Sequence, residues 1–352
     1  MTILIAGGAG FIGTNFVRDW LAAREEPVVV LDSLSCPGSA ANYSFVHPAD
    51  RFHFTRGSIG DEGLVGALLR NHAVRAIVNF AAETHVDRSI TWPTVFFETN
   101  VMGTQRMLEA LREYLDKLDE TARRNFRFLH VSTDEVYGAL EPGQPGFTEL
   151  HPYRPNSPYA ASKAAADHLV RAYQQTFGLG AIITNCSNNY GPFQYPEKLI
   201  PLVIHNALND RPLPIYGDGL QVRDWLYVVD HCAALREVLA RGMPGESYNI
   251  GGGNQKTNLE VVLAICALLD RMLPRGGASS YSDLITHVTD RRGHDRRYAV
   301  DATKISRHLG WRPVTEFEKG LELTVAWYLS NDAWMASVAD GAYQEWIARQ
   351  YG

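Results

Sequence analysis

The sequence has no long apolar run, no excess of positive charge and no closely paired cysteines. None of its apolar stretches approaches the roughly 20 residues that a membrane-spanning helix needs, so we expect no membrane association. The formal net charge of -6 argues against nucleic acid or an anionic membrane surface as the main partner. The apolar start of the chain is short and lacks a basic leader, which favours a buried strand over a signal peptide.

The cysteines and histidines show no ligand spacing. Cys36, Cys186, Cys232 and Cys266 are scattered without a CxxC pair, which indicates reduced thiols in the cytoplasm rather than disulfides or a zinc site. The 12 His residues include no HExxH or comparable pattern, so no metal is expected. The 352 residues suffice for one large domain or two moderate ones, and 45% of them are apolar, as in ordinary folded proteins.

A glycine pattern follows the first apolar stretch, residues 2–6. Gly7, Gly10 and Gly13 form GxxGxxG ahead of a helix expected from about residue 14 to residue 24. Glycines suit a tight strand-to-helix turn at which a pyrophosphate approaches bare N–H groups. The helix N-terminus adds donors and a positive dipole end. The pattern therefore predicts a dinucleotide site.

A second apolar strand, residues 28–31, ends in Asp32. A carboxylate at this position accepts hydrogen bonds from the adenosine ribose and would repel a 2′-phosphate. No Arg or Lys follows Asp32 closely, so NAD is favoured over NADP. The alternative is an Asp that merely caps a loop.

Strand-like and helical stretches continue to alternate. We expect strands at 51–56 and 76–82, helices at 62–71 and 98–118, and a solvated loop over 116–125. This alternation predicts an α/β fold with a Rossmann-like doubly wound parallel sheet, with ligands at the carboxyl ends of its strands.

A Tyr and a Lys share one face of a predicted helix. Ser157 suits the N-cap and Pro158 the first helical position, which places Tyr159 and Lys163 four residues apart. A free Tyr has a pKa near ~10, too high for a base at neutral pH. We expect the Lys163 ammonium, together with the charge of an oxidised nicotinamide, to favour the phenolate. Tyr159 would then take a proton from a substrate hydroxyl while its carbon loses hydride; an unremarkable surface pair is the alternative.

Thr133, Asp134 and Glu135 follow another apolar strand, residues 128–132. Adjacent residues of a strand point to opposite faces, so both acids can reach one substrate only if the chain turns near Thr133. We predict that turn. One carboxyl would stay protonated while its neighbour is ionised, a division that unequal environments or mutual repulsion produce. A solvated acidic pair is the alternative.

With these motifs the sequence resembles the extended short-chain dehydrogenases/reductases, and within them the dTDP-glucose 4,6-dehydratase family. The Thr-Asp-Glu triple is the specific part, because many sugar-nucleotide relatives have the hydroxyl but lack both acids. The similarity spans nearly the whole chain. Its blocks are residues 81–90, 131–138, 188–192, 196–201, 222–228 and 293–298.

The resemblance implies a lyase of nucleotide-sugar metabolism and deoxysugar biosynthesis that acts on dTDP-D-glucose with NAD. C4 is oxidised, Glu135 removes the C5 proton, Asp134 protonates the leaving C6 hydroxyl, and hydride returns to C6. Thr133 would hold the C4 oxygen beside Tyr159. A UDP-glucose 4,6-dehydratase, an NDP-sugar 4-epimerase and a redox-sensing NAD-binding regulator are the alternatives. The two acids disfavour the epimerase, which needs no C5 deprotonation, and a sensor needs no proton relay.

The glycine pattern and the resemblance together imply contact residues, and they include no metal ligand. Expected NAD contacts are Gly7, Gly10, Phe11, Ile12, Gly13, Asp32, Ser35, Ser58, Ile59, Ala81, Ala82, Thr99, Tyr159, Lys163 and Asn189. Expected substrate contacts are Thr84, His85, Thr133, Asn188, Lys198, Leu199, Pro214, Tyr216, Arg223, Asn258, Arg291 and His294.

Two segments depart from the family pattern. Ser58 stands where members commonly carry an acidic residue that contacts the adenine amino group, and residues 33–39 differ from the common run. Both departures concern cofactor binding. Trp327, Trp334 and Trp346 are expected to pack internally, and Tyr351 is a candidate for closing over the sugar.

The change of rhythm after residue 187 suggests two domains. We expect an NAD-binding domain from 1–187 and about 225–256, and a smaller C-terminal α/β nucleotide-sugar domain from 188–224 and about 257–352. The resemblance suggests a homodimer through the helices at 98–118 and 160–177. Their apolar stripes would equally suit packing on the sheet.

Overall fold

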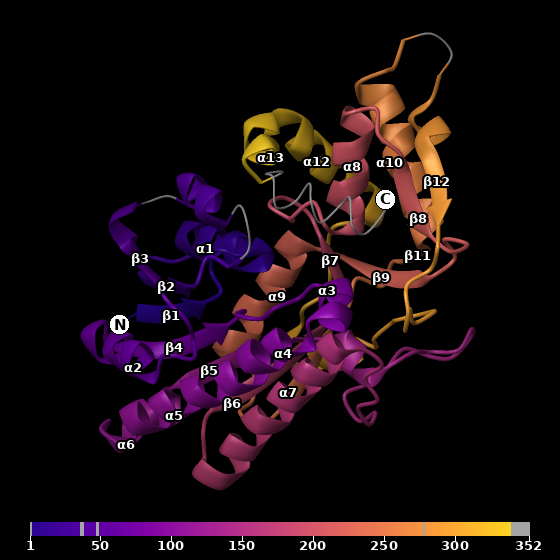
Figure 1. The fold of residues 1–352 in the computed structure, drawn as a ribbon. Coiled ribbons are helices and arrows are strands. Elements are labelled where there is room, and N and C mark those ends of the chain that lie inside the picture. Colours follow the sequence, from indigo (N-terminus) through magenta and orange to yellow (C-terminus); the bar gives the residue numbers. More distant parts are fainter. Residues whose placement is uncertain (1, 36–38, 47–48, 277–278, 339–352) are drawn as a thin grey trace.

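The computed structural model describes residues 2–35, 39–46, 49–276 and 279–338 (Figure 1). Its centre is a seven-stranded sheet in the order β10-β6-β5-β4-β1-β2-β3, and every neighbouring pair is parallel. The reversal of strand order beside β1 makes the sheet doubly wound, as predicted. Its strands are β1 (Thr2–Ala6), β2 (Val28–Asp32), β3 (Phe52–Arg56), β4 (Val74–Asn79), β5 (Arg127–Thr133), β6 (Ala181–Cys186) and β10 (Ser247–Ile250).

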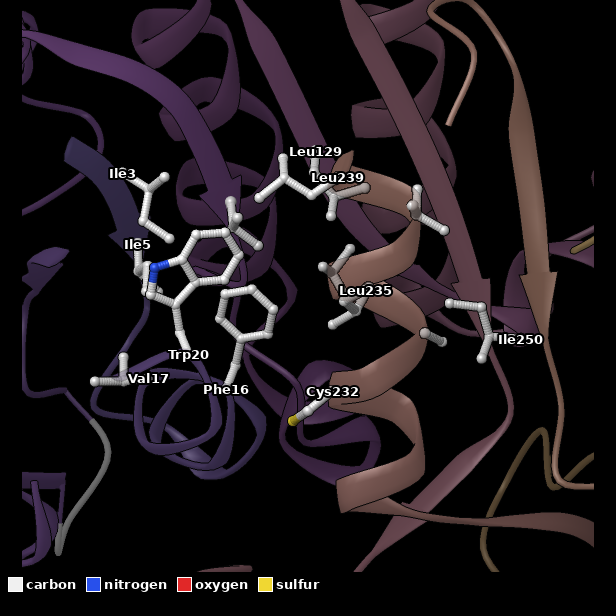
Figure 2. Packing of buried hydrophobic residues seen from close by; sticks show 14 of the residues in the cluster. Ile3, Ile5, Phe16, Val17, Trp20, Leu129, Cys232, Leu235, Leu239 and Ile250 are labelled. Atoms are coloured by element: carbon white, nitrogen blue, oxygen red, sulfur yellow. The ribbon is translucent and has the colours of Figure 1, made fainter. Parts of the chain in front are cut away.

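Alternate residues of the central strands enter two separate apolar layers. Ile3 and Ile5 point to one layer and Leu4 to the other, as the period of a strand requires. The first layer holds Phe16 and Trp20 of α1 against α9 (Figure 2). Helices α2, α5 and α7 cover the opposite face. The helices around this sheet are α1 (Phe11–Ala23), α2 (Glu62–Asn71), α3 (Val86–Thr91), α4 (Pro93–Phe96), α5 (Thr104–Leu115), α6 (Glu120–Asn125), α7 (Pro158–Phe177), α9 (Val228–Arg241) and α11 (Thr303–Leu309).

The remaining elements form a smaller α/β unit beside the carboxyl ends of the sheet (Figure 1). Its two small sheets have the orders β11-β9-β7 and β12-β8. Trp327 and Trp334 pack with Phe193 in its core, which confirms their internal role; Trp346 and Tyr351 lie outside the described residues. The two-domain boundaries stay a prediction. The elements are β7 (Asn188–Tyr190), β8 (Leu213–Tyr216), β9 (Val222–Tyr227), β11 (Gln255–Thr257), β12 (Ile285–Val288), α8 (Leu199–Leu208), α10 (Asn258–Met272), α12 (Phe317–Ser330) and α13 (Asp332–Val338).

Three expected elements differ in the structure. The strand expected over 76–82 is β4, which ends at Asn79. The helix expected over 98–118 begins as a π-helical segment, Phe97–Gly103, and continues as α5. The loop expected over 116–125 was partly wrong, because α6 forms there. The Asp119 side chain accepts the N–H of Ala122 (2.8 Å) and caps this helix, which buries no residue. The lack of an apolar period correctly predicted that this segment is exposed. It did not predict the helix, which the Asp119 cap stabilises. Among the described residues no helix is long and apolar enough to cross a membrane.

Gly13→Ala is expected to destabilise the fold even without a cofactor. A Cβ at Gly13 would lie 2.2 Å from the Gly7 carbonyl oxygen and 2.7 Å from the Gly8 Cα, which are backbone atoms that cannot rotate away. We expect a loss of about 1–3 kcal/mol in the free energy of unfolding, measured with urea. Gly10→Ala is the matched control, because its Cβ would meet only the Gly7 oxygen, at 3.4 Å. Equal losses in both variants would contradict this account.

Candidate active site

A cavity of about 550 Å³, here called the main cavity, lies at the carboxyl ends of the central strands. Its wall includes the turns after β1 and β4 and the last residues of β2 and β5. This is the switch point at which ligands of doubly wound sheets bind, as predicted. Every residue expected to contact NAD lines it, and so do Thr133, Asp134 and Glu135.

The turn predicted at Thr133 is confirmed. β5 ends there, and Asp134–Tyr137 forms a 3-10 helix. The Thr133 hydroxyl accepts the N–H of Glu135 (3.3 Å) and so stabilises the change of direction. Because the chain leaves the strand at this point, Asp134 and Glu135 both line the main cavity instead of pointing to opposite faces.

The two neighbouring acids have different electrostatic surroundings. Burial raises the pKa of Asp134 well above its usual value, and the charges of Glu135 and Asp224 add to the effect. Burial also raises the pKa of Glu135, but the cations Arg291, Arg223 and Lys198 oppose it there. Asp134 is therefore suited to remain a protonated acid and Glu135 to be an ionised base. One oxygen of each carboxyl has no hydrogen-bond partner in the described part of the chain and is free to meet a ligand.

Tyr159 and Lys163 lie in the first turns of α7, which begins as predicted. The Ser157 hydroxyl accepts the N–H of Ala160 (3.1 Å), and Pro158 is the first helical residue. Both side chains line the main cavity.

The pKa of Tyr159 is not lowered in the protein alone, and the expectation that Lys163 and an oxidised nicotinamide together favour the phenolate stays a prediction. Burial raises the pKa of Tyr159 well above its usual value, and Glu135 acts in the same direction. Burial lowers the pKa of Lys163 in turn. Its ammonium donates to the Val131 carbonyl oxygen (2.9 Å) and faces Asp167, so it is not reserved for the phenol. Any phenolate at Tyr159 therefore depends on further positive charge, such as that of an oxidised nicotinamide.

The residues around the glycine turn fit a dinucleotide. No side chain caps α1 at Gly10, and no acidic residue lies in its first turn, so its N-terminal N–H groups can face a pyrophosphate. The Asp32 carboxylate accepts the N–H groups of Ala9 (2.9 Å) and Leu34 (2.8 Å), which fixes it at the end of β2 with further acceptor capacity for a ribose. At Ser58, the hydroxyl accepts the N–H of Gly60 (3.1 Å), and its effect on cofactor retention stays a prediction.

The expected substrate residues divide into two groups. Thr84, Asn188 and Lys198 line the main cavity with Thr133, and the Lys198 ammonium donates to the Thr84 carbonyl oxygen (2.9 Å). The others do not line it. They are His85, Leu199, Pro214, Tyr216, Arg223, Asn258, Arg291 and His294.

Several residues of the second group nevertheless lie near one another, close to Asp87 and Glu135. Tyr216 and Arg291 both donate to the carboxylate of Asp87, at 3.2 and 3.1 Å. The rings of Tyr216 and His294 are 6.0 Å apart. The charges of Arg223 and Arg291 reach Glu135. A substrate that spans from the main cavity towards these cations would place an anionic group among them. In the smaller unit, Leu199 begins α8, Pro214 lies in β8 and Asn258 begins α10. Their expected substrate contacts stay predictions.

Glu197 is a cavity residue to which the sequence reasoning gave no role. It lines the main cavity, and its carboxylate lies 2.9 Å from Nη2 of Arg88 and 3.9 Å from Nε2 of His85. Burial raises its pKa. Its place between Pro196 and Lys198, in one of the similar blocks, was the available signal. No group of three potential metal ligands occurs within the described ranges.

Comparisons with known proteins match most of the chain. A family model described as GDP-mannose 4,6 dehydratase matches residues 4–324. The dTDP-glucose 4,6-dehydratase of Xanthomonas campestris pv. campestris (strain B100) is 56% identical over 344 residues, 97% of each chain.

Solved structures share the fold over almost the whole chain. A dTDP-glucose 4,6-dehydratase of Streptomyces venezuelae, crystallised with NAD, is 47% identical with a TM-score of 0.86, covering 95% of this chain and 98% of that one. A UDP-glucose 4-epimerase of Thermus thermophilus, also with NAD, scores 0.82 at 31% identity, covering 94% and 100%. The fold alone therefore does not separate a dehydratase from an epimerase, and residues of the site must do so.

Proposed function

The chain belongs to the dTDP-glucose 4,6-dehydratase family of the extended short-chain dehydrogenases/reductases, and on that premise we propose how its main cavity works. It converts dTDP-D-glucose to dTDP-4-dehydro-6-deoxy-D-glucose and water, with NAD as cofactor. The observation that carries this proposal is the turn at Thr133, which puts Asp134 and Glu135 in one cavity with Tyr159. An epimerase removes no C5 proton and loses no C6 hydroxyl, so it does not need Asp134 and Glu135 in addition to Tyr159.

We assign the cofactor to the glycine turn of the main cavity. Bound there, NAD would accept hydride from C4 of the sugar and return it to C6. The uncapped N-terminus of α1 would hold the pyrophosphate, and Asp32 would hold the adenosine ribose. The small side chains of Ala81 and Ala82 in the cavity wall would let the flat cofactor lie close to the backbone.

Three side chains transfer protons, and a fourth positions the sugar. Tyr159 takes the C4 hydroxyl proton, and Thr133 holds the C4 oxygen. The ketone at C4 acidifies the C5 hydrogen, which Glu135 removes as an ionised base. Asp134, kept protonated by burial and by its neighbour, protonates the C6 hydroxyl so that it leaves as water.

Activity is expected to fall on the acid side of its optimum pH. Glu135 must be ionised, so the rate at saturating substrate is lost as pH falls through its pKa. Burial raises that pKa and the charge of Arg291 is the largest effect that lowers it. Arg291→Gln should therefore raise the Glu135 pKa further and move the acid limb of the kcat profile to higher pH. Arg296→Gln is the matched control, because Arg296 pairs with the exposed carboxylate of Asp218 (2.8 Å). An unmoved acid limb in Arg291→Gln would refute the assignment of Glu135 as the base.

Mass spectrometry tests the reaction and the preferred nucleobase of the substrate, thymine or uracil, in one experiment. Purified protein receives dTDP-glucose or UDP-glucose in separate tubes, with added NAD and without it. Loss of one water from dTDP-glucose is the expected result. The substrate that reacts faster shows which nucleobase the enzyme prefers. The thymine methyl is worth on the order of 1 kcal/mol, so a several-fold preference is expected. An unchanged mass with galactose appearing on hydrolysis would give the site to an epimerase.

We further propose a homodimer. Support comes from exposed apolar side chains over α3, α4 and the π-helical segment, where Trp92 is 52%, Phe97 40% and Met102 48% exposed. This patch adjoins α5 and α7, the helices expected at the interface. Trp92→Asp should convert a dimer to a monomer in sedimentation equilibrium, because a charge would be buried at the interface. A single-chain mass for the unsubstituted protein would exclude the dimer.

The cytoplasm is our proposed location. Cys186, Cys232 and Cys266 are all buried free thiols, which suits a reducing compartment. Cell fractionation with activity as the marker would test this, and activity confined to a membrane or external fraction would contradict it.

A further inference from the structure

Trp334 is a cavity residue to which the reaction gives no role. It lies in α13, the last helix of the described residues, and it lines the main cavity. Its indole N–H donates to Oδ1 of Asn42 (2.7 Å), which lines the same cavity. Asn42 lies in the 3-10 helix Ser39–Phe45, and both side chains are buried. Packing among aromatic rings does not require this hydrogen bond, so the bond points to a further role for Trp334.

Asn42 in turn holds the glycine turn. Its Nδ2 donates to the carbonyl oxygen of Ala9 (2.8 Å), and the N–H of Ala9 donates to the Asp32 carboxylate (2.9 Å). Both polar groups of the Ala9 backbone are therefore engaged. Ala9 stands between Gly8 and Gly10, whose backbones rotate easily when nothing holds them. The two hydrogen bonds thus fix the conformation of the turn at its middle.

The indole of Trp334 determines which way the Asn42 amide faces. An indole N–H can only donate, whereas an amide offers one accepting oxygen and one donating nitrogen. Oδ1 must therefore face Trp334, which leaves Nδ2 for the Ala9 carbonyl oxygen and for the Thr14 hydroxyl (3.2 Å). The opposite orientation would place donor against donor at the indole and oxygen against oxygen at Ala9. Each of those buried groups would then lack a partner, which is costly.

The state of the turn matters for an anion bound there. The uncapped N-terminal N–H groups of α1 follow directly after the turn. A pyrophosphate at these groups would be repelled by a carbonyl oxygen that rotated towards it, and the bond from Asn42 prevents that rotation at Ala9. A turn left free between two glycines would have to be ordered by the ligand, which lowers affinity. The hydrogen bonds therefore preorganise the turn.

We propose that Trp334 is a positioning residue of the cofactor site, which acts through Asn42 to hold the glycine turn in the form that binds the pyrophosphate of NAD. Helix α13 is thus part of the cofactor site, although it belongs to the smaller unit. A second contact supports this link, because Nδ2 of Asn15 in α1 donates to the Pro192 carbonyl oxygen (2.9 Å) of the smaller unit. This inference rests on the proposed function.

Equilibrium dialysis of the full chain against radiolabelled NAD tests the proposal. Trp334→Phe keeps an aromatic ring and removes the N–H, so NAD affinity should fall about 2- to 10-fold, the range for one hydrogen bond. Affinity for dTDP, measured in the same way, should not change. Trp327→Phe is the matched control. Its ring packs against those of Phe193 (4.7 Å) and Trp334 (5.1 Å) but does not line the main cavity, so NAD affinity should be kept.

A double variant tests whether Trp334 acts through Asn42. Asn42→Ala alone should lower NAD affinity about 5- to 100-fold, because the Ala9 carbonyl oxygen loses its partner. Adding Trp334→Phe to Asn42→Ala should lower the affinity no further, since the two residues work as one unit. A second loss as large as that of Trp334→Phe alone would refute the link between them.

A closer analogue keeps the test decisive if Trp334→Phe does not fold. With 3-benzothienylalanine at position 334, the bicyclic shape remains and sulfur replaces the N–H, so the same loss of NAD affinity is expected. Unchanged NAD affinity would refute the proposal. Equal losses in Trp334→Phe and Trp327→Phe, or equal losses for NAD and dTDP, would reduce Trp334 to packing. An unsubstituted protein that binds neither NAD nor dTDP would refute the proposed function instead.

Discussion

Glu135→Gln is expected to stop the reaction after C4 has been oxidised. The amide cannot take the C5 proton, whereas Tyr159 and Lys163 remain in place for the first step. Product formation should fall by about 10²- to 10⁴-fold, the usual contribution of a general base. The absorbance of reduced nicotinamide should then rise on mixing with dTDP-glucose and persist, because elimination does not follow.

Asp134→Asn is the matched variant for this experiment. It removes the acid and leaves the base, so the C5 hydrogen should still exchange with deuterium from the solvent while water is not lost. Glu135→Gln should show no such exchange. If the C5 hydrogen exchanges in Glu135→Gln and not in Asp134→Asn, the roles of the two carboxyls are reversed. If it exchanges in both variants, neither carboxyl is the required base.

Tyr159→Phe is expected to prevent the oxidation itself. Without the phenol nothing takes the C4 hydroxyl proton, so turnover should fall by about 10²- to 10⁴-fold and no reduced nicotinamide should appear. NAD binding should persist, because the glycine turn and Asp32 are untouched. Cofactor absorbance on mixing with substrate distinguishes this variant from Glu135→Gln.

The control for Tyr159→Phe lies on the same helix. Tyr173→Phe removes a hydroxyl that donates to Glu109 and does not line the main cavity, so turnover should be almost unchanged. A Tyr159→Phe enzyme that still reduces its cofactor at the original rate would show that another group accepts the C4 proton.

The fold was accessible from the sequence because its signals are local. The unbroken apolar run of residues 2–6 and the glycines of the following turn predict a strand buried on both faces and a tight entry into α1. The structure shows both. The break at Phe97–Gly103 and the cap at Asp119 were missed, since no change of apolar period marks either of them.

The site was only partly accessible. The turn at Thr133 followed from a chemical requirement, because two adjacent acids cannot serve one sugar from a straight strand. The pKa of Tyr159 could not be predicted, since it depends on burial by elements distant in the chain. Glu197 and the cavity position of Trp334 were overlooked for the same reason. Neither stands out from its loop or helix pattern, and only tertiary packing shows that both residues line the main cavity.

The most direct test of the central claim follows a label through the sugar. dTDP-glucose with deuterium at C4 is given to the purified enzyme, and the product is examined by mass spectrometry and NMR. The account predicts loss of one water with the deuterium retained and moved to C6, because hydride leaves C4 and returns within one closed site. Deuterium that stays at C4 without loss of water, or that disappears into solvent, would contradict it.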